Sequence, residues 1–331
     1  MEKVLTIIIP TYNVEKYIRQ CLDSIILDEE QMKYLEVVIV NDGTPDMSGV
    51  IAHEYESRYP QSIKVIDKEN GGHGSAWNVG LKNTNGKYVR FLDSDDWLSN
   101  LSSFMEELKS HDEDLIFTHL IKFDEQSKSS SVNKIQNIEY NKTYITSTFS
   151  YIETGNHCNI YNFWHCTYKR DIFKGEQPMF VEKVFYDDAI LFVAPFVLGN
   201  TMVFIDTELY NYRIGQSGQS VNVNVERKHA HDYIKVSKGL IEFANRHKDL
   251  NKVQTKQRDT FLSKYIKNRF SLFSLLPYQE FKVVVDDLLP YIIKNAPYIR
   301  LSPKAILYRF MPRYFGWYCT KLFNKYILKI N

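Results

Sequence analysis

Residues 35–44 read LEVVIVNDGT, an apolar run from Leu35 to Val40 that ends abruptly in polar residues and a glycine. A short apolar run bounded by turn residues is typical of a strand buried on both faces. Similar runs lie at 5–10, 63–67, 88–93 and 115–119, with apolar residues at helical spacing between them. Strands that alternate with helices indicate a parallel sheet. We therefore predict an α/β fold with a mainly parallel central sheet flanked by helices.

The remaining sequence predicts a second region of different composition. The chain has 331 residues, which is enough for roughly two domains. After the polar stretch GQSGQS at 215–220, the sequence becomes rich in Lys, Asn, Leu and Tyr at helical spacing. We place a boundary near residue 220, with an α/β domain at 1–220, divided into halves at 1–100 and 101–220. A mostly helical region follows at 221–331.

Several local patterns refine this outline. Apolar residues recur at helical spacing between Val14 and Ile26, and a helix-like run covers 187–197. Residues 202–205 read as a strand, whereas the polar stretch at 124–150 predicts a mobile excursion or an irregular β region.

Charge is unevenly distributed along the chain. Lys and Arg number 41 and Asp and Glu 40, so the formal net charge is +1 and nothing global favours a nucleic-acid partner. Residues 288–331 contain eight basic residues and no acidic one, and subtracting their +8 from +1 leaves −7 on residues 1–287. An acidic body thus precedes a basic tail.

Cysteine usage and hydropathy predict the compartment. Cys21, Cys158, Cys166 and Cys319 form no CxxC pair, which argues against a zinc site or a disulfide framework and favours reduced thiols. The apolar run at the N-terminus is too short for a signal peptide, and the run at 189–198 is too short to span a membrane. We expect a cytoplasmic protein, either soluble or peripheral on the inner face of the cell membrane.

Polar residues follow each predicted strand, where ligands bind in an open parallel sheet. Asp93, Asp95 and Asp96 come directly after the strand at 88–93 and would repel one another unless a cation lies among them. Mg²⁺ or Mn²⁺, held by one or two carboxylates and completed by phosphate oxygens of a substrate, fits this pattern. The alternative is a solvated acidic turn that stabilises the start of the following helix.

Two other loops carry weaker signals. The loop NGGHGS at 70–75 allows backbone N–H groups to approach an anion or a sugar closely, or it is a plain tight turn. Asp42 either accepts a hydrogen bond from the ring N–H of a pyrimidine or bonds its own backbone in a turn. The chain contains neither GxGxxG after its first strand nor a P-loop motif, which disfavours a dinucleotide dehydrogenase and a P-loop NTPase.

The motifs IIPTYN (8–13), VIVNDGT (38–44), KENGGHGSAWNVGL (68–81) and GKYVRFLDSDDW (86–97) occur in one order at one spacing. Together they resemble the family 2 glycosyltransferases of the GT-A fold, of the bacterial surface-polysaccharide type. The resemblance is specific from residue 4 to about 100 and looser to about 220. It implies inverting transfer of a sugar from a nucleotide diphosphate donor, with a UDP-sugar favoured, to an acceptor hydroxyl. Residues 1–100 would then be the nucleotide-sugar-binding half of a GT-A catalytic domain, and 101–220 its acceptor half.

The resemblance also implies roles for individual residues. Asp93, Ser94 and Asp95 match the DxD motif, with Asp95 the expected direct metal ligand and Asp93 the second. Residues expected to bind the nucleotide sugar are Pro10, Thr11, Tyr12, Asn13, Asp42, Lys68, Gly74, Ser75, Asn78, Asp93, Ser94, Asp95 and Arg213. Residues expected on the acceptor side are Asp96, Trp97, Trp164 and His165.

Two of these assignments have a plain structural alternative. Arg213 resembles an arginine that follows the last strand of related enzymes and would neutralise the diphosphate, or it forms an ordinary surface salt bridge. His165 lies where related sequences build the acceptor side, although a lone histidine beside a tryptophan is more often packed than catalytic.

An inverting reaction needs a base opposite the leaving diphosphate. In the family it comes from a Glu-Asp pair at the start of a helix, and the matching stretch here is FYDDAILF at 185–192. We therefore predict Asp188 as the base and Asp187 as its neighbour in the usual glutamate position. The alternative is an acidic pair that only stabilises a helix start.

The basic tail has two interpretations. Lys321, Lys325 and Lys329 share one side of a predicted helix and apolar residues share the other, which suits an anionic membrane surface. Such a tail fits an acceptor linked to a polyprenyl diphosphate lipid, as in capsule, O-antigen or wall polymer synthesis. Alternatively, the helix packs on the body of the protein and its lysines are simply solvated.

Two other functions compete with glycosyl transfer. A sugar nucleotidylyltransferase would need a glycine-rich loop after the first strand, and residues 10–19 contain no glycine. A catalytically silent subunit that binds a nucleotide sugar or a membrane would not need Asp93, Asp95 and Asp188 intact.

Overall fold

The computed structural model describes residues 2–149, 163–176, 178–216, 225, 228–273, 276–299 and 317–318. The chain divides into two compact units. The first unit comprises Met1–Lys183 and Ile190–Ser217, and the second comprises Val184–Ala189 and Gly218–Asn331. The chain therefore leaves the first unit for six residues, at 184–189, before it returns.

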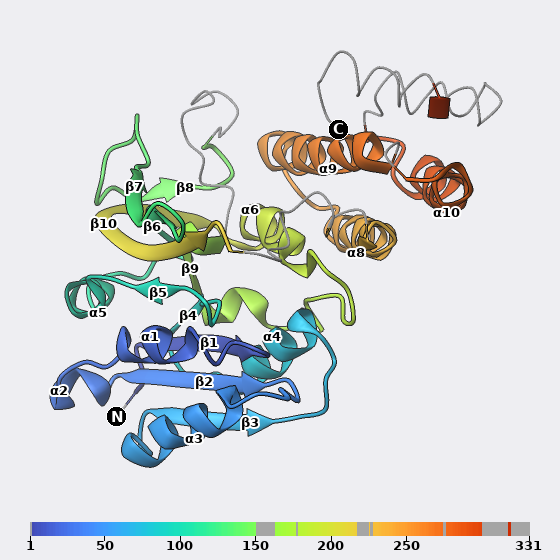
Figure 1. Cartoon of the computed structure of the whole chain (residues 1–331). Helices are drawn as coiled ribbons and strands as arrows, with labels where there is room; N and C mark the ends of the chain where they lie inside the picture. The colour runs from blue at the N-terminus through green and yellow to red at the C-terminus, as the bar shows by residue number, and fades with distance from the viewer. Residues whose placement is uncertain are drawn as a thin grey trace. The chain divides into compact units, whose positions relative to one another are not determined.

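The first unit is built on one curled sheet (Figure 1). In the described residues its strand order is β3 (Ile63–Asp67), β2 (Leu35–Asn41), β1 (Leu5–Thr11), β4 (Tyr88–Phe91), β9 (Cys166–Lys169), β6 (Leu115–Asp124), β10 (Thr201–Ile214) and β5 (Trp97–Leu98). Strand β7 (Ser129–Asn133) pairs with β6, and β8 (Tyr144–Ile145) pairs with β10.

Most neighbouring strands of the main sheet are parallel. Strands β3, β2, β1 and β4 form one parallel block, and β6 and β10 form another. Strand β9 lies between the blocks and is antiparallel to both β4 and β6. The predicted α/β fold with a mainly parallel sheet is therefore confirmed.

Helices cover both faces of the parallel block. Those of the first unit are α1 (Ile18–Asp23), α2 (Glu29–Met32), α3 (Ser48–Arg58), α4 (His73–Lys82), α5 (Leu101–Leu108) and α6 (Ala194–Leu198). Short 3₁₀ helices occupy η1 (Phe163–His165) and η2 (Arg170–Phe173), and η3 (Asp187–Phe192) begins in the second unit.

Successive side chains of β1 point to opposite faces of the sheet, and both faces are buried. Ile7 and Ile9 pack in the core with α1, α3 and α5, while Ile8 points to the other face and meets α4. All three side chains are fully buried. A strand covered on both sides needs a continuous apolar sequence, which is why the runs at 5–10 and 35–40 identify the central strands.

Three predicted elements differ from the structure in length. The expected helix at 14–26 is reduced to α1, because Asn13 has a φ of +57° and the chain enters the helix through a turn closed by the Val14 carbonyl. The run at 187–197 is a 3₁₀ helix followed by α6, which has Pro195 in its first turn. The strand predicted at 202–205 is part of β10, which continues to Ile214.

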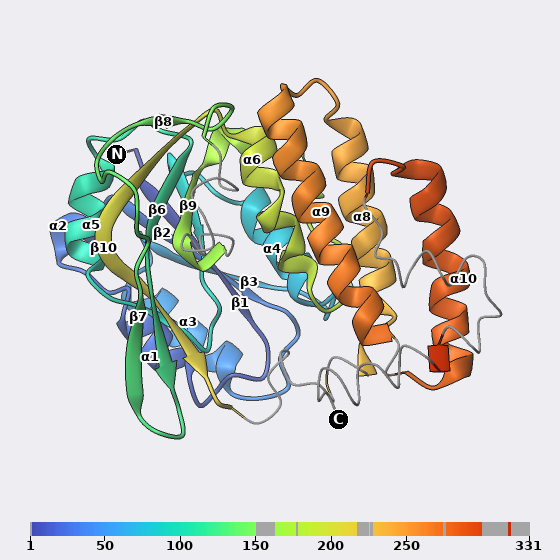
Figure 2. The ribbon, with the colours of Figure 1, turned by 90° about the horizontal axis from the view of Figure 1, so that it is seen from above.

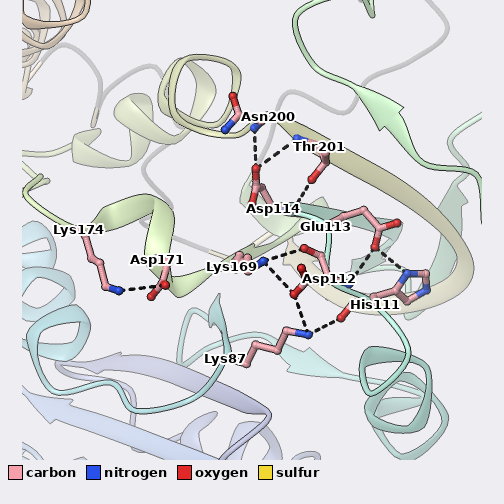
Figure 3. A network of polar contacts seen from close by, with 10 residues as sticks. All are labelled: Lys87, His111, Asp112, Glu113, Asp114, Lys169, Asp171, Lys174, Asn200 and Thr201. Carbon is pink, nitrogen blue, oxygen red and sulfur yellow. Dashed lines mark hydrogen bonds and ion pairs between the residues drawn. The ribbon is translucent and has the colours of Figure 1, made fainter.

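A polar network ties the strands together at the edge of the sheet where β4, β6 and β10 begin (Figure 3). The Asp112 carboxylate contacts Lys87 Nζ at 3.2 Å and Lys169 Nζ at 2.9 Å, which joins the segments preceding β4 and β6 to β9. Asp114 Oδ2 accepts hydrogen bonds from the backbone N–H groups of Asn200 and Thr201, at 2.7 and 3.3 Å. The network aligns β6 with β10.

The long helices of the second unit are α8 (Asp232–Arg246), α9 (Lys252–Phe273) and α10 (Tyr278–Asn295). Figure 2 shows them running alongside one another, with α8 next to both α9 and α10. Val236, Leu240, Leu262 and Leu288 are buried. The predicted membrane-binding helix around Lys321, Lys325 and Lys329 lies outside the described residues. Of the helices that the structure describes, none is long and apolar enough to cross a membrane.

The contact between α4 and β1 leaves no room for a side chain at Gly80. A Cβ atom added there would lie 2.2 Å from Ile8 Cγ2. We expect Gly80→Ala to lower the free energy of unfolding by about 1–3 kcal/mol, although alanine is the better helix former. Urea unfolding of both proteins measures the difference. Lys82→Ala, at an exposed position of the same helix, is the control, and equal stability of Gly80→Ala and wild type would contradict this packing.

Candidate functional site

Loops that follow β1, β2, β3 and β4 gather at the carboxyl edge of the parallel block, and they carry most of the predicted site residues. Pro10 and Thr11 end β1 and are buried, whereas the Tyr12 side chain is 50% exposed. Asn13 donates its backbone N–H to Thr44 Oγ1 at 2.8 Å. The loops after β1 and β2 are therefore joined directly.

Asp46 fixes the loops after β1 and β2 to each other. Its Oδ1 accepts hydrogen bonds from Thr44 Oγ1 and the Ser48 N–H, and its Oδ2 accepts one from the Glu15 N–H. Partial burial opposes ionisation, but the bonds from Ser48, Thr44 and Glu15 outweigh it and lower the pKa of Asp46 to about 2. The backbone around Tyr12 and Asn13 is thus held in place without a ligand.

Asp42 holds the glycine-rich loop that precedes α4. Its carboxylate is buried and accepts hydrogen bonds from Lys68 Nζ at 2.5 Å, the Gly71 N–H at 2.9 Å and the Gly72 N–H at 2.8 Å. Gly72 has a φ of +85°, which requires glycine. A carboxylate has roughly four acceptor positions. Asp42 therefore retains capacity for about one more donor.

Gly74, Ser75 and Asn78 lie in α4, and all three are buried. The Asn78 amide donates to the Phe180 carbonyl and to Glu182 Oε1, and its oxygen accepts the N–H groups of Met179 and Phe180. Both amide hydrogens and both lone pairs are thereby used. Asn78 therefore braces the segment at 179–182, and its expected contact with the nucleotide sugar stays a prediction.

The loop after β4 carries the acidic residues. Asp93 and Asp95 are half-buried, while Ser94 and Asp96 are buried. Asp93 Oδ1 lies 3.2 Å from His73 Nε2, and Asp95 Oδ2 accepts a hydrogen bond from Gln216 Nε2 at 3.2 Å. Burial and the neighbouring Asp93 carboxylate raise the pKa of Asp95 to about 6, against the opposing effects of Gln216 and Arg213. The loop concentrates negative charge that a bound cation would compensate.

The Asp96 carboxylate, which we expected on the acceptor side, is bonded to two residues of β10. Its Oδ1 accepts the Arg213 backbone N–H at 2.7 Å, and its Oδ2 accepts the Tyr210 hydroxyl at 2.7 Å. The same hydroxyl accepts the Asp93 N–H at 3.2 Å. Burial, followed by Asp95 and Asp93, raises the pKa of Asp96 well above its usual range. Asp96 is 1% exposed and braces the loop against β10, and its expected acceptor-side role stays a prediction.

Arg213 also braces this loop. Its Nε donates to the Asp95 carbonyl at 2.9 Å, and its other nitrogens bind Gln20 Oε1 at 2.5 Å and the Glu125 carboxylate. The guanidinium lies over the rings of Tyr17, Trp97 and Phe123, between 4.8 and 5.7 Å from their centroids. The guanidinium is therefore buried while its partner Glu125 is half-buried, and Arg213 Nε holds the backbone of Asp95.

Trp97 and Trp164 are used in packing. Trp97 covers the Arg213 guanidinium, and Trp164 stacks on Tyr212 with ring centroids 4.1 Å apart. The Trp164 carbonyl accepts a hydrogen bond from the buried Arg90 guanidinium at 2.5 Å. Both tryptophans are half-buried, and each supports a strand that borders the acidic loop.

The side chain of His165 is buried in the core. It is 1% exposed, and its Nδ1 contacts the Thr118 carbonyl at 2.8 Å. Burial lowers the pKa of His165 to about 4, so the ring is neutral at pH 7. The structure thus places His165 in the core, and the acceptor-side role expected for it stays a prediction.

Asp187 and Asp188 belong to the second unit, where they begin η3. Asp187 is 4% exposed, whereas Asp188 is half-buried. Of the pair, Asp188 is the carboxylate more accessible to a substrate, as its predicted role requires.

Sequence patterns do not predict the partners that hold the acidic loop. Tyr210, Gln20, Glu125 and Gln216 lie far from Asp93–Asp96 along the chain, and each is a common residue type outside the quoted motifs. Only the fold brings them to the loop. Tyr210 and Arg213 share β10, so the position of this strand decides the geometry.

The acidic loop could hold a divalent cation through two carboxylates, with the other ligands supplied by a substrate. Among the residues that the structure describes, no three His, Cys, Asp or Glu side chains are arranged to enclose a metal ion. Mg²⁺ is commonly held by one or two carboxylates and completed by phosphate oxygens of a substrate, and Mn²⁺ accepts the same ligands. Asp95 and Asp93, whose proximity raises the pKa of Asp95, form such a pair.

Comparison with known protein families identifies the family to which the chain belongs. Residues 6–175 match the model of the family described as glycosyl transferase family 2. Glycosyltransferase GlyA of Streptococcus pneumoniae is 32% identical over 222 residues, which cover 65% of this chain and 31% of GlyA. Minor teichoic acid biosynthesis protein GgaB of Bacillus subtilis is 40% identical over 110 residues, which cover 32% of this chain and 12% of GgaB. The chain thus spans less than a third of either relative.

A solved structure shows the same fold. TarS residues 1–349 of S. aureus, in complex with UDP-GlcNAc, matches with a TM-score of 0.68 and covers 97% of this chain and 91% of that chain. Sequence identity between the two is 18%, so this likeness concerns the fold. The GT-A arrangement expected from the motifs is confirmed.

The depressed pKa of His165 predicts acid lability. The unfolded histidine titrates near 6.5 and the folded one near 4, so the unfolded chain binds more protons between these values. The contribution to stability is complete above pH 6.5 and is lost as the pH falls towards 4, by about 3 kcal/mol in total.

Urea unfolding between pH 7 and pH 4.5 tests this prediction. His165→Asn does not titrate and keeps an amide donor for the Thr118 carbonyl, so its stability is expected to fall less steeply with acid than that of wild type. Identical pH slopes for the two proteins would show that His165 is not the responsible group.

Proposed function

The chain belongs to glycosyl transferase family 2, and we propose that it transfers a sugar from a nucleoside diphosphate donor to an acceptor hydroxyl. The observation that carries this proposal is the acidic loop. Asp93 and Asp95 lie half-buried at the carboxyl edge of the parallel block, beside the loop that Asp42 organises. Loops at this edge are where open α/β sheets bind nucleotides.

A UDP-sugar is the proposed donor. Asp42 can accept one more hydrogen bond, such as that of a pyrimidine ring N–H, and the half-exposed Tyr12 ring offers a surface for a base. The N–H groups of Gly71 and Gly72 hold the Asp42 carboxylate in this region. The complex of TarS with UDP-GlcNAc, a protein of the same fold, supports the choice of nucleotide.

Mn²⁺ or Mg²⁺ is the proposed cofactor. Asp95 would bind it directly, with Asp93 as the second ligand, and the ion when bound would neutralise the diphosphate leaving group. Arg213 sets the backbone of Asp95, and Tyr210 with Asp96 sets the backbone of the whole loop. These residues give the carboxylates a fixed position before the donor arrives.

Asp188 is the proposed general base of an inverting reaction. A base must lie opposite the leaving group and take the proton of the acceptor hydroxyl as that oxygen attacks the sugar. Asp188 is half-buried and Asp187 is buried, which favours Asp188 for this proton transfer and Asp187 for support of η3.

A lipid-linked glycan at an anionic membrane surface is the proposed acceptor, on the cytoplasmic side. The charge of +8 on residues 288–331 would draw the chain to such a surface. The likeness to GgaB, a minor teichoic acid biosynthesis protein, supports a surface polymer as the product.

Nucleotide binding tests the donor site first. In a thermal-shift panel of UDP, dTDP, GDP and CMP, each with and without Mn²⁺, we expect UDP to stabilise the fold most and Mn²⁺ to increase the shift. A nucleotide at 100 times its Kd adds about 2.7 kcal/mol, which is several degrees in Tm. Asp95→Asn should remove the increase caused by Mn²⁺.

Asp112→Asn is the matched control, because Asp112 is an exposed carboxylate at the opposite edge of the sheet. Nucleotides and Mn²⁺ should shift the Tm of Asp112→Asn by the same amount as they shift that of wild type. If no nucleotide raises Tm with or without Mn²⁺, the donor site is refuted and a silent subunit becomes the better interpretation.

Membrane binding tests the acceptor proposal. The full chain should sediment with liposomes that contain phosphatidylglycerol and much less with neutral liposomes, and salt should weaken the binding. Replacing Lys321, Lys325 and Lys329 together by Gln should reduce sedimentation several-fold. A protein that stays in the supernatant with anionic liposomes would refute the membrane-bound acceptor.

A further inference from the structure

The segment that carries Asp187 and Asp188 is anchored by residues of the helical unit. The ring of Phe185 stacks on His229 with centroids 3.6 Å apart and an interplanar angle of 24°. The next ring, Tyr186, stacks on Tyr233 of α8 at 4.3 Å and 11°. Two consecutive aromatic side chains immediately before the acidic pair are therefore held by the start of α8.

A backbone hydrogen bond reinforces the two stacks. The Phe185 N–H donates to Asp232 Oδ2 at 3.2 Å, and His229 Nδ1 lies 3.1 Å from the same oxygen. Asp232 is the first residue of α8, so one carboxylate connects the segment, the histidine and the helix. Tyr233, which follows it, is fully buried.

Backbone conformation shows that these contacts determine the shape of the segment. Tyr186 has a φ of +65°, in the left-handed region that a bulky side chain rarely adopts. Such a conformation persists only where the surroundings impose it. The Tyr186 carbonyl then accepts the Ala189 N–H at 3.2 Å, which closes the turn containing Asp187 and Asp188.

We propose that Asp232, His229 and Tyr233 are positioning residues for Asp188. In this proposal the helical unit contributes to catalysis by imposing the left-handed turn at Tyr186 and thereby directing the carboxylate two residues later. The inference rests on the proposed role of Asp188 as the general base. A base displaced by about 1 Å can lose on the order of 100-fold in rate, so contacts that fix its backbone affect turnover directly.

Hydrogen exchange tests the structural part of this proposal. In Asp232→Ala, the amides of residues 185–189 should exchange at least ten-fold faster than in wild type, because the Phe185 N–H loses its acceptor. Asp232→Asn keeps an oxygen at this position and should recover most of the protection. Unchanged exchange of these amides in Asp232→Ala would overturn the proposal.

Turnover tests the catalytic part. The assay measures release of UDP from the UDP-sugar that reacts fastest with Mn²⁺ and water as the acceptor, among those of GlcNAc, GalNAc, glucose and galactose. We expect Asp232→Ala and Tyr186→Ala to lower kcat at least ten-fold with less than a two-fold change in KM for the donor. Tyr186→Gly relieves the backbone conformation but loses the stack, so it should be as slow as Tyr186→Ala.

A double-mutant cycle separates positioning from general damage. If Asp232 acts through Asp188, then adding Asp232→Ala to Asp188→Asn should lower the residual turnover less than two-fold. Tyr291→Phe removes a 2.9 Å hydrogen bond to Glu242 between α10 and α8 without touching the segment, and it should leave kcat unchanged.

The outcomes distinguish the inference from the function on which it rests. If Asp188→Asn abolishes turnover while Asp232→Ala and Tyr186→Ala keep wild-type kcat, the positioning role is refuted and the base assignment stands. If Asp188→Asn itself turns over normally, the proposed base is wrong, and the positioning role is refuted with it.

Discussion

The buried carboxylate of Asp96 joins β10 to the loop that follows β4. It accepts the Tyr210 hydroxyl and the Arg213 N–H, and the Tyr210 hydroxyl in turn accepts the N–H of Asp93. A buried carboxylate is costly unless its oxygens are satisfied, so this arrangement strongly favours one loop conformation. The positions of Asp93 and Asp95, and every proposal about a metal or a diphosphate, depend on it.

Charge is arranged differently in the two parts of the site. Around Asp42 and Asp46 the carboxylates are matched by Lys68, by backbone N–H groups and by hydroxyls, and these loops are complete in the absence of a ligand. Around Asp95 the negative charge of the carboxylates is not matched in this way, and burial together with the Asp93 carboxylate raises the pKa of Asp95 to about 6. The chain's own donors thus hold one part of the site, whereas the other part keeps a negative charge that the proposed cation would compensate.

The sequence was sufficient for the central strands because a strand covered on both faces requires an unbroken apolar run, as at 5–10 and 35–40. The acidic loop could be found because polar residues follow such a run. Individual roles were less predictable. Asp96 and Asn78 stand within motifs and His165 stands beside a tryptophan. The side chains of all three are used in buried hydrogen bonds that depend on β10, on the segment at 179–182 and on Thr118. Contacts of this kind join residues about fifty to more than a hundred positions apart, and no local pattern contains them.

The strand order has a consequence for synthesis of the chain on the ribosome. Strands β1 to β4 form a parallel block, and among the described residues the second side of its outer strand, β4, pairs with β9. β9 follows the whole of α5, β6, β7 and β8, and β10 comes later still. A nascent chain that has completed β4 therefore presents an apolar, unpaired strand edge until residue 169 has emerged, and such edges are sites of aggregation. Because the middle strand β9 comes late in the chain, the edge of β4 stays open from the completion of β4 to the emergence of residue 169. A chaperone that covers this edge would act during that period.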